Sequence, residues 1–209
     1  MDLIKSQIQN YPFLGNYFQP DGKKLARTIE QVVCRFIGDF KVGDNLVRNA
    51  DALCRLSASN ENGVFNKLIV IQAGSIVEAA LHEIIHRAQN FAREGVPNIS
   101  KADRDELATR NVELFNNIIN VMKKYDILKG LRADIYDELH KLRKYRNKVH
   151  IQTDVDIKYV PRDEDAAFSA KTVILALEFT VRVLNHLNEK FSRPKELEHF
   201  AHSLSIPLA

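Results

Sequence analysis

Two arginines, an asparagine and a histidine stand close together between Glu138 and His150 in this 209-residue chain. If this segment is a helix, each residue turns by about 100°, which puts His150 about 20° from Arg143. Guanidinium groups bind phosphate oxygens through paired N–H donors, and an imidazole transfers protons near neutral pH. The spacing therefore predicts a phosphate-binding, acid–base site on one side of a helix. Its residues are Arg143, Arg146, Asn147 and His150.

These groups match the needs of metal-independent RNA cleavage. That reaction requires a base for the 2′-hydroxyl proton, an acid for the leaving 5′-oxygen, and cations that hold the phosphate. His150 can serve as base or acid, and Asn147 can orient either His150 or the substrate. One histidine does not readily perform both proton transfers at once, so a single copy of the motif is half of an acid–base pair.

The run from Arg143 to His150 resembles the RX4–6H motif of HEPN domains, helical-bundle proteins often found among RNA-cleaving toxins and defence nucleases. Six residues separate Arg143 from His150, which fits the motif. Arg146 followed by Asn147 resembles the arginine and polar residue that commonly start it, but only three residues separate Arg146 from His150. Either arginine is therefore a candidate for the motif arginine. The resemblance covers about residues 65–191, including a small-residue-rich segment at 72–81.

The resemblance implies a metal-independent endoribonuclease, a toxin or defence effector, that acts on RNA without a cofactor. It also implies a homodimer in which two motif helices face a shared cleft, and an antitoxin or other regulatory protein as a further partner. The family includes members without nuclease activity, so a non-catalytic helical module that binds RNA or protein is the second hypothesis. A structural role is the third possibility for this face, with Arg146 paired to Glu78 or Glu138 inside the bundle.

A zinc site is a separate hypothesis for the segment from His82 to His86, which reads HExxH. This spacing puts His82 and His86 on one helical face beside Glu83, as in zinc metalloproteases. The extended form HExxHxxGxxH is absent, and Arg87 follows the second histidine directly. A third ligand would have to come from Glu106, Glu113 or Glu178. A zinc-dependent hydrolase is therefore an alternative, and the competing interpretation places both histidines on a partly exposed helix side.

Long helices must position these residues. The chain contains only 8 glycines and 6 prolines, and apolar residues recur at helical spacing through most of it. We expect an all-α fold, an antiparallel four-helix bundle at residues 61–209 with an N-terminal helical extension at 1–60. The predicted helices run from about 23–40, 46–56, 65–93, 100–125, 131–150, 165–191 and 197–204.

Composition indicates a cytoplasmic protein without a membrane span. A formal charge of +3 and a pI near 8.8 permit a nucleic-acid partner without requiring one. Cys34 and Cys54 form no CxxC pair, which favours reduced intracellular thiols. The first residues lack the basic start and apolar run of a secretory signal, and the most apolar region, 68–85, contains acidic residues that would be costly in lipid.

Overall fold

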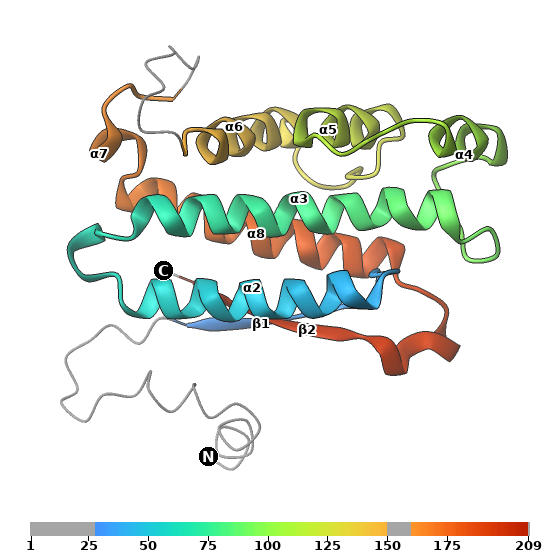
Figure 1. The fold of residues 1–209 in the computed structure, drawn as a ribbon, viewed down its shortest axis with the longest axis horizontal. Helices are drawn as coiled ribbons and strands as arrows, with labels where there is room; N and C mark the ends of the chain where they lie inside the picture. The colour runs from blue at the N-terminus through green and yellow to red at the C-terminus, as the bar shows by residue number, and fades with distance from the viewer. Residues whose placement is uncertain (1–27, 150–159, 209) are drawn as a thin grey trace.

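A computed structural model describes residues 28–149 and 160–208 and shows a mostly helical chain with one two-stranded sheet (Figure 1). The α-helices are α2 (Phe40–Ala58), α3 (Asn66–Asn90), α4 (Lys101–Ala108), α5 (Phe115–Lys124), α6 (Ile135–Asn147), α7 (Glu164–Ala167) and α8 (Ala170–Phe191). The strands are β1 (Ile29–Cys34) and β2 (His202–Pro207), and short 3₁₀ turns occupy Glu61–Gly63 and Lys195–Phe200.

The central element is α3, as the sequence predicts from its nearly continuous apolar character. Figure 1 shows α2 along one side of α3 and the succession α4, α5, α6 along the other, and α8 also packs on α3. Among the described residues, α3 is the one helix long and apolar enough to cross a membrane, and 61% of its most apolar window is buried inside the protein. Its apolar composition is therefore accounted for by its place in the core.

The helix expected at about 23–40 is wrong over the described residues, because Ile29–Cys34 forms β1 instead. This strand pairs antiparallel with β2, with Val32 opposite Leu204, both fully buried. β-Branched residues such as Ile29 and Val32 favour a strand when a partner is present. The partner lies near the other end of the chain, so helical spacing within the local sequence could not reveal it.

Three further predicted helices differ from the structure. The expected helix at 165–191 is divided into α7 and α8, because Phe168 ends the first and Ser169 caps the second. The expected helix at 197–204 is a 3₁₀ turn followed by β2. The expected helix at 100–125 is divided into α4 and α5. Ser100 caps α4 as predicted, accepting the backbone N–H of Asp103 at 3.2 Å. The carbonyl of Leu107, in the last turn of α4, accepts from the Gln89 side chain at 2.9 Å, which satisfies this helix end where α4 stops.

One core spans the described chain. Buried apolar residues of β1, α2 and β2 belong to the same cluster as those of the central helices. Val32, Leu46, Leu53 and Leu204 are examples of this shared core. Residues 28–58 are thus joined to the helical body through α2 packing on α3 and through the sheet that links β1 to β2.

A buried histidine predicts acid sensitivity of this fold. His186 on α8 is 5% exposed, and its Nε2 lies 3.2 Å from the carbonyl oxygen of Ile127. Burial is the main cause that lowers the pKa of His186 below its ordinary value of 6.5. The stability contributed by the neutral ring is therefore fully present above that value and is lost as pH falls through the lowered pKa.

Exchange of His186 for glutamine removes this titration while keeping a side-chain N–H donor. We expect the free energy of unfolding of the wild type to fall more steeply between about pH 7 and about pH 5 than that of His186→Gln. Urea unfolding at several pH values measures both slopes. Equal slopes would contradict a titrating role for this ring.

Candidate functional site

Helix α6 carries the sequence-predicted site and is held against α3 by close contact. Its buried residues Ile135, Leu139 and Leu142 face the core. A Cβ placed on Gly74 of α3 would lie 3.1 Å from the Cβ of Arg146, so a glycine at this point allows the two helices to approach closely. The helix ends at Asn147, three residues before the end expected from the sequence.

Arg146 is engaged by protein groups. Its Nη2 donates to the carboxylate of Glu78 on α3, and its Nη1 donates to Oδ1 of Asn147 at 3.1 Å. The side chains of Arg146 and Glu78 are 34% and 17% exposed. The pairing with Glu78 that the sequence left open is therefore present in the structure.

Glu78 joins α3 to two other helices. Besides binding Arg146 of α6, its carboxylate interacts with the backbone N–H of Phe115, the first residue of α5. Burial raises the pKa of Glu78 above its usual range, and Arg146 and this backbone hydrogen bond act in the opposite direction. Glu78 thereby holds the guanidinium of Arg146 and lies near the start of α5.

Arg143 has a different environment from Arg146. It is partly buried, and its Nε has no hydrogen-bond partner within the described chain. It lines a surface cavity of about 960 Å³, together with His140 of α6 and Asn116 of α5. A buried N–H without a partner is costly, so this atom gives Arg143 no structural anchor comparable to the bond between Arg146 and Glu78.

The four predicted site residues are only partly brought together. Arg146 and Asn147 line a second cavity of about 480 Å³ with Ile71 and Val149. Arg143 lines the larger one instead. His150 lies outside the described residues, so its predicted role stays a prediction.

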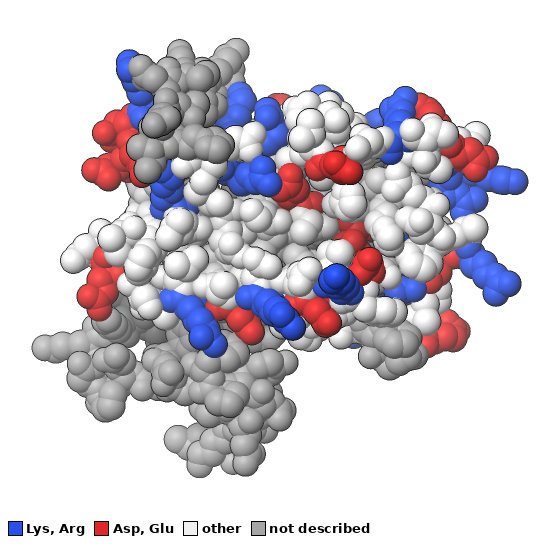
Figure 2. Space-filling model, viewed as in Figure 1, with Lys and Arg blue, Asp and Glu red and all other residues white. Residues whose placement is uncertain are grey.

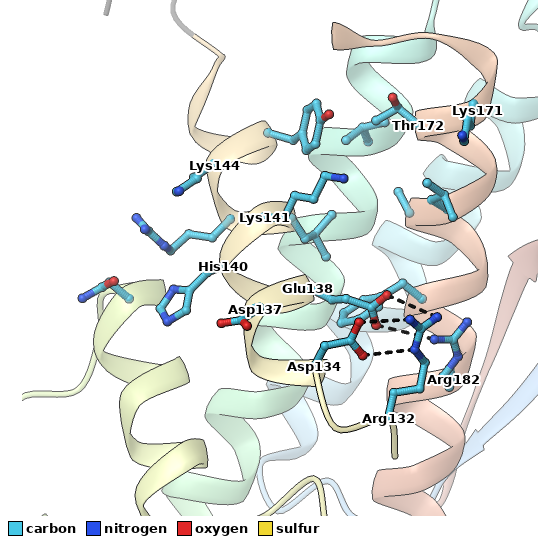
Figure 3. A pocket seen from close by; sticks show the side chains of 18 residues that line it. Arg132, Asp134, Asp137, Glu138, His140, Lys141, Lys144, Lys171, Thr172 and Arg182 are labelled. Carbon is cyan, nitrogen blue, oxygen red and sulfur yellow. Dashed lines mark hydrogen bonds and ion pairs between the residues drawn. The ribbon is translucent and has the colours of Figure 1, made fainter. Parts of the chain in front are cut away.

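The larger cavity is rich in cations. Six lysines and arginines line it, against three carboxylates. The carboxylates of Asp134 and Glu138 are held by arginines, with Arg132 3.0 Å from Asp134 and Arg182 3.6 Å from Glu138. In Figure 3 these ion pairs gather at one end, whereas Lys141 lies nearer the other, where Lys171 and Thr172 of α8 are drawn. The remaining rim therefore favours an anionic ligand.

The surface around α6 is also rich in lysine and arginine. Figure 2 shows an uncharged band over α3, bordered by charged side chains on both sides, with lysine and arginine atoms beside α6. Lys144 and Arg146 occupy the last turn of α6. Lys148, just after it, donates to the carbonyl oxygens of Pro161 and Arg162, the latter at 2.6 Å, so its ammonium group already serves a structural purpose.

The HExxH segment is built differently from a zinc site. Glu83 is 1% exposed, and its Oε2 accepts the backbone N–H groups of Gly38 at 3.0 Å and Asp39 at 2.9 Å. Asp39 in turn caps α2. Within the described residues, no three His, Cys, Asp or Glu side chains are grouped to hold a metal ion. Glu83 is a structural anchor for the entry into α2, a role unlike that of a general base.

Arg87, one turn after Glu83, is a buried structural residue that the sequence reading missed. It is 2% exposed and donates to the carbonyl oxygens of Phe36 at 3.3 Å, Gly95 at 3.1 Å and Phe191. These carbonyls belong to the loop before α2, the loop after α3 and the end of α8. Burial lowers the pKa of Arg87 to about 10.

His140 and Asn116 are two cavity residues outside the predicted site, and helical spacing already places His140 near the motif face, where it could assist. For His140 a signal exists, because it precedes Arg143 by three residues and therefore lies on the same side of α6. Asn116 gives no such signal, since only tertiary structure brings α5 beside α6.

Comparisons of the chain with protein-family models, with curated protein sequences and with solved structures find no match.

Proposed function

We propose that this protein is a metal-independent endoribonuclease of HEPN type, a toxin or defence effector of the cytoplasm. The observation that supports it most is the contrast between the two arginines of α6. Arg146 is bound to Glu78, whereas Arg143 lines a cation-rich cavity and forms no ion pair with a carboxylate among the described residues. Arg143 is also the arginine whose spacing to His150 fits the motif.

In this proposal Arg143 binds the phosphodiester group at which the RNA is cleaved, and its N–H donors stabilise the negative charge that redistributes on the phosphate oxygens. His150 transfers the proton of the 2′-hydroxyl or that of the leaving 5′-oxygen. Asn147 uses its oxygen to accept from Arg146, which leaves its amide nitrogen as the end that donates to substrate or histidine. Glu78 and Arg146 hold the end of α6 in place.

The proposal includes a four-helix catalytic unit and a homodimer. The unit consists of α3, the α4–α5 pair, α6 and α8, and its support is that the other helices all pack on α3. The dimer would supply the second histidine that the reaction needs. Exposed apolar residues at this end of the molecule support it, since Val149 is 44% exposed and Leu68, one turn from Ile71, is 47% exposed.

The engagement of Arg146 by Glu78 favours a second candidate, a non-catalytic helical module that binds RNA or a protein such as an antitoxin. In that case the polar residues of α6 stabilise the bundle and the cavity binds without cutting. RNA remains the ligand class best matched by the excess of cations around the cavity.

Cleavage of structured RNA in EDTA tests the proposal. We expect the full chain to cut RNA with EDTA present, leaving a cyclic phosphate on one product and a 5′-hydroxyl on the other. His150→Ala should reduce the rate by about 10²- to 10⁴-fold, whereas His82→Ala should leave it unchanged.

Three outcomes would overturn it. Loss of cleavage in EDTA would remove the metal-independent mechanism, and a loss in His82→Ala would point to the zinc alternative. RNA bound but never cut would establish the non-catalytic module.

A further inference from the structure

We propose that His140 of α6 and Asn116 of α5 bind a backbone phosphate of RNA next to the one held by Arg143. The inference rests on the proposed function for its ligand, and it adds a substrate subsite formed by residues outside the predicted motif. The subsite consists of His140, Asn116 and the neighbouring face of Arg143.

Geometry brings these groups to one wall of the larger cavity. His140 and Arg143 are three residues apart within α6 and so project from the same side of the helix. Figure 3 shows His140 pointing away from α6 toward α5, on the opposite side from the groove that faces α8. Asn116, in the first turn of α5, lines the same cavity. α5 packs directly against α6, and Arg146 of α6 is bound to Glu78 of α3.

The charges around His140 favour an anion. The groups that act on its ring are Arg143 and Lys144 of α6, Lys123 of α5, and a single carboxylate, Asp137. Burial and then Arg143 lower the pKa of His140, with Lys123 and Lys144 acting in the same direction. A phosphate beside the ring would offset this repulsion, so binding would raise the pKa and be accompanied by proton uptake.

The arrangement of donors fits a phosphate backbone better than an isolated anion. His140 and Arg143 line the larger cavity, and Asn147, one turn further along α6, lines the second; His140 and Asn147 are about 10 Å apart along the axis at about 1.5 Å per residue. A chain of phosphates can contact such a row at successive turns, ending beside the motif. The planar guanidinium and the amide of Asn116 both match phosphate oxygens in geometry.

Binding of an uncleavable RNA tests the subsite without catalysis. The probe is a fully 2′-O-methylated RNA, measured by fluorescence anisotropy with the full chain. His140→Gln and Asn116→Ala should each weaken binding about tenfold, the loss expected for a charge-assisted phosphate contact, and His140→Gln should reduce the salt dependence. His86→Gln, a change to a partly exposed histidine of α3, is the matched control and should bind like the wild type.

Nuclear magnetic resonance of the histidine rings supplies the second readout. Saturating RNA should raise the pKa of His140 and leave the ring resonances of His86 unmoved, and RNA affinity should fall as pH rises through the raised pKa of His140. An unmoved His140 with RNA bound would overturn the subsite, as would unchanged affinity in both variants. Equal displacement of the RNA by polyglutamate would assign the surface to an acidic protein instead.

These outcomes are separable from failure of the proposed function. If His140 responds to the uncleavable RNA but natural RNA is never cut, the catalytic proposal fails and the subsite stands. If RNA is cut in a His150-dependent manner but His140 does not respond, the subsite fails alone.

Discussion

Arg143→Ala is expected to reduce kcat/KM for RNA cleavage by about 10²- to 10³-fold, the loss found when one donor to a developing charge is removed. The free energy of unfolding should change by less than about 1 kcal/mol, because Nε of Arg143 has no hydrogen-bond partner in the described chain and its loss removes a desolvation cost. Cleavage kinetics and urea unfolding on the same preparations measure the two effects.

Arg146→Ala is the matched variant, three residues along the same helix. Its removal takes the counterion from Glu78, whose side chain is 17% exposed, so we expect a loss of about 1–2 kcal/mol of stability. Burial already raises the pKa of Glu78, and the loss of Arg146 would raise it further. The native state would then bind more protons than the unfolded state, so the stability of this variant should recover as pH falls toward the raised pKa.

The two arginines exchange roles if the results are reversed. Loss of cleavage in Arg146→Ala at unchanged stability, together with an active Arg143→Ala, would make Arg146 the phosphate-binding residue. Glu78→Gln separates the cases further, because it keeps a hydrogen-bond acceptor for Arg146 while removing the negative charge. Cleavage close to that of the wild type in Glu78→Gln would agree with a positioning role for this pair.

The sequence predicts those elements whose burial is visible in local periodicity. The central helix α3 is apolar on nearly every side, so its extent could be read with an error of few residues. Ile29–Cys34 shows the limit, because the same apolar residues fit a helix until a strand partner is supplied by His202–Pro207. A pairing between the two ends of the chain leaves no trace in a window of about 11–18 residues.

The sequence could predict which site residues lie on the same side of α6, but not what each of them contacts. Helical spacing places Arg143, Arg146 and Asn147 on adjacent sides of α6, and the structure agrees. Spacing could not say which arginine is bound to a carboxylate of the protein. That depends on Glu78 of α3, which lies close to α6 because Gly74 allows the two helices to approach. Nor could it find Asn116, which contributes to the cavity only because α5 lies beside α6.

Arg87→Met is expected to lower the free energy of unfolding by about 3–5 kcal/mol, the loss typical of breaking a buried charged network by removing one member. The guanidinium donates to the carbonyl oxygens of Phe36, Gly95 and Phe191, which come from three separate segments. Each carbonyl left buried without a donor costs about 1–3 kcal/mol, partly offset because a buried charge is no longer desolvated. Marginal domain stability of about 5–15 kcal/mol makes such a loss decisive for folding at physiological temperature.

The urea midpoint measures this loss, with Arg48→Met on the exposed side of α2 as the control, expected within about 0.5 kcal/mol of the wild type. The urea midpoint of Arg87→Lys should lie between those of Arg87→Met and the wild type. An ammonium group keeps the charge but lacks the planar fork of the guanidinium that reaches three segments. An Arg87→Met protein with the wild-type midpoint would show that those carbonyls find other donors. The expected result instead makes Arg87, which directly follows the HExxH segment, a structural residue, since it joins the entry of α2 to the loop after α3 and the end of α8.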